Sequence, residues 1–414
     1  MIPLMVYYEV KKVLSKKSSK LLLIIIVLSV AWSCHAAIYS VEWIDPSGNV
    51  ELGYMAAGKL RAAQKEWAGT LDESLLHRAL AEVKRLDNMP EYLSKNHTEN
   101  RIAQGWRQGV QEIRQLLNLS FSNDFQNFDD RIAHTLSSDD LSDFYPNRIK
   151  LLRMWLYGNT NNFLTEREKQ FLVDQYSTLA TPFLIDYSQG WVQVMEHADT
   201  VMYLGIILLG LLLAGIFSDE FLWKTDAVYF SSAYGRSDGT KAKLITGFLL
   251  ITVVFSLSMG IYSLVVLGSL GFDGAFCPIQ INVRYWKSMY NMNFLQAYLL
   301  ILCMGYVGYL FFGFLVMLVS AQNRSSMLAV MCPPLAILLP SFLQFILSNI
   351  NSSLLLKMLG LLPEKMLNGA QVIRMLNIYS LGTRVLPSVF LLLPMYIGVS
   401  LMMVYMCYQW NRIK

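Results

Sequence analysis

Six long apolar stretches separate more polar segments along the chain. A helix that crosses a bilayer needs about 20 mainly apolar residues, because the hydrocarbon is roughly 30 Å thick and each residue rises about 1.5 Å. The stretches that meet this requirement cover residues 21–38, 200–217, 244–270, 294–320, 327–347 and 385–408. The pattern therefore predicts an all-α polytopic membrane protein with six transmembrane helices.

Residues 39–199 lie between the first two of these stretches and have the composition of a soluble domain. Their apolar positions follow a helical period, with little of the alternation that is typical of strands. Thr70 precedes Glu73, and Thr165 precedes Glu168, at the spacing of a capping box that starts a helix. We therefore expect a large, mainly helical extracytoplasmic domain between helices 1 and 2.

Basic residues indicate which helix ends lie in the cytoplasm. The first apolar stretch is preceded by five lysines, namely Lys11, Lys12, Lys16, Lys17 and Lys20. Cytoplasmic flanks of transmembrane helices are enriched in Lys and Arg. Counting from an inside N-terminus places residues 218–243, the turn at Arg324 and the tail from Arg412 to Lys414 in the cytoplasm as well. We therefore predict a multi-pass protein of the bacterial cytoplasmic membrane with both termini inside.

The start of the chain has a second interpretation. A basic segment, an apolar run and small residues such as Ala36 and Ala37 are also typical of a cleaved signal peptide. Cleavage would leave five helices with the C-terminus still inside. The helix count alone therefore does not distinguish the two.

Composition agrees with the membrane assignment. Hydrophobic residues make up 54% of the chain and charged residues only 15%, a surplus of apolar residues over what a soluble core needs. The formal net charge of +4 is too small for a nucleic-acid partner, and the basic residues gather beside apolar runs. The five cysteines are scattered and give no disulfide framework; whether Cys34 and Cys277 pair is left open.

The fifth apolar stretch and the segment after it are less regular. Pro333, Pro334 and Pro340 free backbone carbonyls that neighbouring helices or a water-lined cavity must satisfy, as a packed kink or as part of a gate. Residues 348–384 form the next outer loop, in which apolar and charged residues alternate. This alternation predicts an interfacial amphipathic helix.

The richest polar detail lies in the predicted cytoplasmic loop, residues 218–243. It begins with Asp219 and Glu220, and its middle is apolar at Val228, Tyr229 and Phe230. This pattern predicts a short amphipathic helix. The later sequence GRSDGTK lacks the spacing of a phosphate-binding P-loop, and no pair of histidines has ligand spacing, so we expect no catalytic, cofactor or metal site in this chain.

At this loop the chain resembles the permease subunits of type-2 ABC exporters, the ABC-2 type transporter family. The matching positions are Phe217, Glu220, Thr225, the patch 227–233, Arg236 and Lys243. Residues 1–20, and Tyr7 to Lys20 in particular, look like the cytoplasmic amphipathic elbow that precedes the first helix in that family. The elbow favours a retained first helix over a cleaved signal.

The resemblance implies a transport subunit without its own ATPase site. Its partners would be a separate ABC ATPase that binds the ATP, a second permease copy or related permease, and membrane lipid. The exported compound would be a peptide, a lipid or an amphiphile. The coupling loop, residues 218–243, would use Glu220, Thr225, Val228, Tyr229, Phe230 and Arg236. The three apolar residues would fill a cleft of the ATPase, while Glu220 and Arg236 orient the loop.

Other classes of function compete with this one. An intramembrane enzyme would need convergent ionisable groups inside the helices, and the apolar stretches contain neither H-E-x-x-H nor paired acids. A membrane receptor or sensor would bind a ligand or partner protein through the outer domain and signal through another protein. In a further alternative, the loop 218–243 only packs against the inner membrane face.

Overall fold

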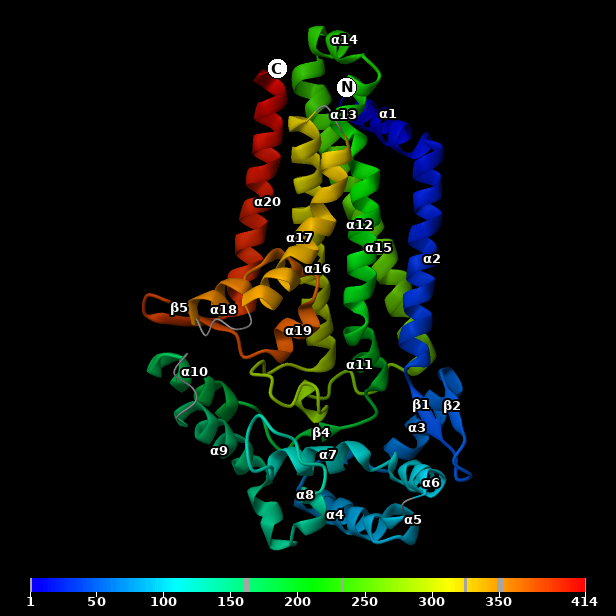
Figure 1. Cartoon of the computed structure of the whole chain (residues 1–414), viewed down its shortest axis with the longest axis vertical. Helices are drawn as coiled ribbons and strands as arrows, with labels where there is room; N and C mark the ends of the chain where they lie inside the picture. The colour runs from blue at the N-terminus through cyan, green and yellow to red at the C-terminus, as the bar shows by residue number, and fades with distance from the viewer. Residues whose placement is uncertain are drawn as a thin grey trace.

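The computed structural model describes residues 2–94, 96–158, 164–232, 234–323, 326–347 and 353–413. The chain is mainly helical, as predicted, and the described part adds three small antiparallel sheets of two strands each. An upright bundle of long helices carries a domain of short helices at one end, and both chain termini lie at the other (Figure 1). We call these the domain end and the termini end.

Five helices of the described chain are long and apolar enough to cross a membrane. They are α2 (Lys17–Tyr39), the continuous run of α11 (Gln189–Glu196), α12 (Ala198–Leu213) and α13 (Gly215–Leu222), α15 (Thr240–Leu270), α16 (Phe294–Gln322) and α20 (Ser388–Ile413). The chain is therefore a multi-pass membrane protein. The second of these helices is longer than the predicted 200–217, because it continues into the domain as α11.

The sixth predicted helix is present but differs from the others. Helix α17 (Ser326–Leu347) packs against α16 and α12 within the bundle (Figure 1), and its apolar portion Ser326–Pro340 is shorter than a full span. A Cβ atom added at Gly210 of α12 would lie 3.0 Å from the ring of Pro333. Glycine thus lets the proline-containing helix approach α12 closely.

The domain between α2 and α11 contains eight α-helices in its described part. Its elements are β1 (Glu42–Ile44), β2 (Val50–Leu52), α3 (Tyr54–Lys65), β3 (Gly69–Thr70), α4 (Glu73–Asp87), α5 (Pro90–Leu93), α6 (His97–Arg107), α7 (Gln111–Ser120), α8 (Ile132–Thr135), a 3₁₀ turn (Asp139–Asp143), α9 (Phe144–Tyr157), α10 (Glu166–Ser177) and β4 (Leu184–Ile185). Apolar side chains at helical spacing on α4 and α7, such as Leu76, Leu80 and Leu116, are buried in its core. The domain is mainly helical, as expected.

The first predicted capping box is wrong. Asp72, not Thr70, caps α4, and its carboxylate accepts a hydrogen bond from the backbone N–H of Leu75 at 2.9 Å. Thr70 is part of β3 and pairs with Leu184 of β4. An aspartate lies between the two predicted residues, so the helix begins at Glu73 and takes its cap from Asp72, an equally good acceptor.

The strands themselves were not predicted. β1 pairs with β2, β3 with β4, and β5 (Ile378–Leu381) with β6 (Arg384–Pro387), all antiparallel. Each strand has only two to four residues. Such strands are too short to display the period-two alternation that identifies strands in a sequence.

The segment predicted to hold one interfacial helix is broken into several pieces. Its described part contains α18 (Ser353–Leu359), a 3₁₀ turn (Pro363–Met366), α19 (Gly369–Arg374) and the hairpin β5–β6. These pieces lie between the bundle and the domain (Figure 1). Both Cys34 and Cys277, whose pairing was open, are free thiols.

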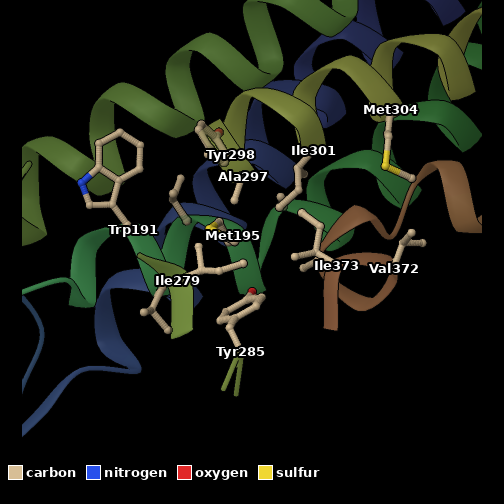
Figure 2. Packing of buried hydrophobic residues seen from close by; sticks show 14 of the residues in the cluster. Trp191, Met195, Ile279, Tyr285, Ala297, Tyr298, Ile301, Met304, Val372 and Ile373 are labelled. Carbon is tan, nitrogen blue, oxygen red and sulfur yellow. The ribbon is translucent and has the colours of Figure 1, made fainter. Parts of the chain in front are cut away.

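A continuous apolar core joins the domain end of the bundle to these connecting pieces. Figure 2 shows side chains from three elements close together: Trp191 and Met195 of α11, Tyr298 and Ile301 of α16, and Ile373 of α19. All five residues are at most 5% exposed. Full burial of each such large apolar side chain stabilises the fold by roughly 1.5–3 kcal/mol. This core therefore joins α11, which leads out of the domain, to α16 and to the connecting pieces.

Polar contacts fix the same junction. Glu168 of α10 is fully buried, completes the predicted capping box with Thr165, and accepts hydrogen bonds from Lys357 at 2.6 Å and from the Ser380 hydroxyl at 2.9 Å. Burial works against the charged form of Glu168, but the contacts with Lys357, Thr165 and Ser380 outweigh it and lower the pKa of this carboxyl. One carboxylate thus starts a domain helix and holds the segment that leads to α20.

Candidate functional site

The turn between α13 and α15 protrudes from the termini end of the bundle (Figure 1). Lys224 follows α13 in the left-handed conformation (φ 55°) and reverses the chain. The six-residue helix α14 (Asp226–Ser231) and a π-helical turn (Gly235–Gly239) then lead into α15. A short helix lies where the sequence predicted one.

The first helix of the chain lies across the same end. α1 (Ile2–Ser15) and α2 meet at Lys16, whose backbone is extended (φ −61°, ψ 138°) and ends the first helix. α1 packs against the start of α15, where the hydroxyl of Thr246 donates to the carbonyl of Val6 at 3.5 Å. The segment compared with an elbow is therefore a separate helix bent away from the first bundle helix.

A charge cluster joins α1, α13 and α15. We call it the charged joint and define it by Lys12, Lys16, Asp219, Glu220 and Lys243. Glu220 accepts hydrogen bonds from Lys12 at 2.7 Å, and its other oxygen lies 2.6 Å from Lys243. Lys16 pairs with Asp219. The side chain of Lys243 is only 1% exposed, so the pair with Glu220 is shielded from water and depends on its geometry.

Aromatic rings enclose the charged joint. The ammonium of Lys243 lies 4.6 Å from the ring centre of Tyr229 and 5.1 Å from that of Phe217. The ammonium of Lys16 lies 5.5 Å from the ring of Trp223. Such cation–π contacts stabilise a desolvated ammonium by about 1–2 kcal/mol. The ring of Tyr229 therefore faces into the joint.

The predicted apolar anchors are placed differently from one another. Val228 is 74% exposed at the tip, whereas Tyr229 is half-buried against Lys243. The side chain of Phe230 lies outside the described side chains. Leu222 and Trp223, which the sequence analysis did not select, are 70% and 52% exposed beside Val228 on the same turn. Of the predicted anchors, Val228 is exposed at this turn and Tyr229 is not, while Leu222 and Trp223 add exposed apolar surface that was not predicted.

The predicted orienting residues also differ. Glu220 makes the charge pairs described above, whereas the side chain of Arg236 is exposed and has no salt bridge to a described residue. Thr225 begins α14, and its carbonyl accepts a hydrogen bond from the amide of Tyr229 at 2.9 Å. The pairing of elbow lysines with loop acids was missed, although opposite charges in residues 11–20 and 219–220 were a signal for it.

Comparison with known proteins yields no match to a protein-family model, a curated protein or a solved structure. Within the described ranges, no three His, Cys, Asp or Glu side chains gather as a metal site would require. Conclusions on function therefore rest on the geometry of this chain.

Proposed function

We propose that this chain is the membrane-spanning permease subunit of an ABC transporter of the ABC-2 type, working with ATP hydrolysed by a separate subunit. The observation that supports the proposal is the charged joint, which ties the crosswise helix α1 and the second and third bundle helices to one exposed turn. A partner that moves this turn would move all three helices together.

Transmission of motion requires a rigid connection. α13 is continuous with α12 and α11, so the turn lies at one end of a 34-residue helix whose other end is in the domain. Glu220 on that helix holds Lys243 at the start of α15 and Lys12 on α1. A docked ATPase would thus act on the helices through short, directional contacts.

The proposal includes an orientation. Lysines of residues 11–20 and the basic residues Lys224, Lys241 and Lys243 all lie at the termini end, which we place in the cytoplasm of a bacterial cell by the positive-inside rule. The domain then faces outward. α17 would complete six crossings, and neighbouring helices would then have to satisfy the carbonyls freed by its prolines.

Export is the direction implied for this class of transporter, and the substrate would be a peptide, a lipid or an amphiphilic compound. A second copy of this chain or a related permease would line the translocation route with it. Membrane lipid would cover the outward apolar side chains of α15 and α20, among them Val253, Leu257, Leu264, Leu401 and Tyr405.

A receptor function is the second candidate. The observation that favours it is a polar cleft of about 600 Å³ between the domain and α11, large enough for a small ligand. In this alternative, ligand binding would be passed to another protein through the long helix. Transport and ligand sensing are compatible in one complex.

Val228→Asp should detach the ATPase while leaving the protein in the membrane. The side chain is 74% exposed, so the change costs the fold little, yet a buried charge in a docking cleft removes about 2 kcal/mol or more of binding. That loss corresponds to roughly thirtyfold weaker association. Tagged chain is purified in mild detergent, and co-purifying proteins are identified and quantified by mass spectrometry.

Val50→Asp is the matched control, since Val50 is an exposed valine of β2 in the domain. It should leave the ATPase bound. If no Walker-containing ATPase accompanies the unaltered chain, or if Val228→Asp retains it in full, the permease proposal fails at this turn.

A further inference from the structure

A polar cleft separates the domain from the extension of the second bundle helix. Helices α3, α6 and α7 line it on one side, and α11 and residues 282–284 line it on the other. Its volume of about 600 Å³ is within the range of sites for small ligands. The charged joint lies at the opposite end of the molecule, so the cleft is a separate feature.

Glutamine amides dominate the walls of this cleft. Gln104 lies on α6, Gln108 follows the end of that helix, and Gln111 and Gln115 lie about one turn apart on α7; all four line the cleft. The side chains of Gln104, Gln111 and Gln115 make no hydrogen bond to the described residues. Gln108 is different, because its amide bonds both to the backbone N–H of Ile44, at 3.2 Å, and to its carbonyl, at 3.0 Å.

Three more glutamines face them from other elements. Gln189 and Gln193 lie one turn apart on α11, and Gln64 lies on α3. Gln64 is only 6% exposed, and its amide oxygen has no hydrogen-bond partner within the described residues. This oxygen is closed off from solvent, so a ligand in the cleft does not reach it.

The cleft walls contain equal numbers of acidic and basic residues. These are three acids and three bases: Glu42, Glu112, Asp130, Arg107, Arg114 and Arg284. A balanced wall favours a ligand of low net charge. None of the lining residues is aromatic, so the cleft lacks the flat platform on which nucleic-acid bases stack. We expect the same lack to disfavour sugar rings.

We propose that this cleft binds a short, polar peptide segment of low net charge. The side chains of Gln104, Gln111 and Gln115 each offer one acceptor and two donor hydrogens, which match the carbonyl and N–H of a peptide backbone. Small apolar side chains, Leu60 and Val192, provide the remaining contact. The proposal goes beyond the permease function and holds or fails independently of it.

One continuous helix connects the cleft to the termini end of the molecule. Gln189 and Gln193 belong to the same continuous helix that carries Asp219 and Glu220. A peptide held between these glutamines and α7 would fix the distance between that helix and the domain. The cleft is therefore placed to report a bound peptide to the charged joint.

Glu112 gives the cleft a pH dependence. Burial raises the pKa of its carboxyl to about 7, although hydrogen bonds from Gln189 and Gln64 oppose the shift. The other titratable groups that act on it, Tyr187 and Cys277, have pKa values raised by burial and stay neutral between pH 5 and 8. Since the folded state holds the proton more tightly, the contribution of Glu112 to stability falls as pH rises from about 4.5 to 7.

Glu112→Gln should therefore stabilise the protein at pH 8 but not at pH 4.5. The neutral amide removes the need to bury a charge, so the melting temperature should rise at pH 8 and stay unchanged at pH 4.5. Thermal unfolding of both proteins is followed from pH 4.5 to 8. A difference in stability that does not change with pH would contradict this assignment.

The peptide proposal is tested with a blocked tetraserine, acetylated at one end and amidated at the other. Binding to the full chain in detergent is measured by calorimetry, with maltotetraose as the sugar probe. We expect saturable binding of the peptide alone. Gln111→Leu combined with Gln115→Leu should weaken it about 5- to 150-fold, because two hydrogen bonds are lost at roughly 0.5–1.5 kcal/mol each.

Gln170→Leu is the matched control, since Gln170 is an exposed glutamine of α10 outside the cleft. It should bind the peptide like the unaltered chain. Thermal melting checks that each variant is folded, which is expected because neither Gln111 nor Gln115 bonds to the described protein. Absence of peptide binding, equal binding by the double variant, or binding of maltotetraose alone would each overturn the proposal.

Discussion

Glu220→Ala should destabilise the protein by about 3–5 kcal/mol, the usual cost of removing one partner from a buried ion pair. The ammonium of Lys243 would then be buried at 1% exposure with no carboxylate at 2.6 Å. Lys12 loses the same partner but keeps Glu9 at 3.1 Å and reaches water more easily. Thermal or denaturant unfolding in detergent measures the loss.

Glu82→Ala is the matched control for this change. Glu82 also pairs with a base at 2.6 Å, but its partner Arg85 is 57% exposed on the surface of α4. Exposed pairs of this kind contribute only about 0–1 kcal/mol. Adding Lys243→Met to Glu220→Ala should restore much of the stability, because no charge is then left buried. Equal effects of Glu220→Ala and Glu82→Ala would show that the charged joint does not stabilise the fold.

The bundle helices were predictable because hydrophobicity over about 20 residues is a local property. The sequence placed a helix at 244–270, and α15 covers Thr240–Leu270. It did not show that the second apolar stretch continues as α11, since Gln189 and Gln193 are polar. Those residues are helical because the domain and residues 282–284 surround them with a polar cleft, a tertiary effect.

The candidate site was predictable in position but not in detail. A loop rich in charge at 218–243 indicated the place, and α14 lies within it. The inward orientation of Tyr229 was not predictable, because it depends on Lys243, fourteen residues later, and on Glu220. A run of three apolar residues does not indicate which side chain points inward and which is exposed. The packing of α1 and α15 around the turn determines these orientations.

The seating of the domain was the least predictable feature. It depends on residues 271–293, which the sequence indicated only as a connection between two helices. In the structure, this segment runs into the domain and meets Arg148 of α9, whose guanidinium donates to the carbonyls of Trp286 at 3.1 Å and Ser288 at 3.2 Å. No local pattern links α9 to a segment more than 130 residues away.

Arg148→Met should therefore loosen the domain from the bundle by about 1–3 kcal/mol. Arg148 is 4% exposed, and its guanidinium also stacks on Tyr176, 4.0 Å from the ring centre. Methionine keeps the apolar stem but leaves the buried carbonyl of Trp286 without a donor, at about 1–3 kcal/mol. The carbonyl of Ser288 keeps the amide of Gln280 as a donor at 3.3 Å. Hydrogen exchange of residues 271–293 should accelerate about thirtyfold for a loss of 2 kcal/mol.

The control is Arg153→Met, which removes an exposed arginine from the same helix. Its exchange pattern should match that of the unaltered chain. Arg148→Lys should lie between the two, because a lysine keeps a charge but cannot reach both carbonyls with a planar fork. If exchange increases in α9 alone and not in residues 271–293, Arg148 stabilises the domain interior instead, and the seating depends on the apolar core of α11, α16 and α19.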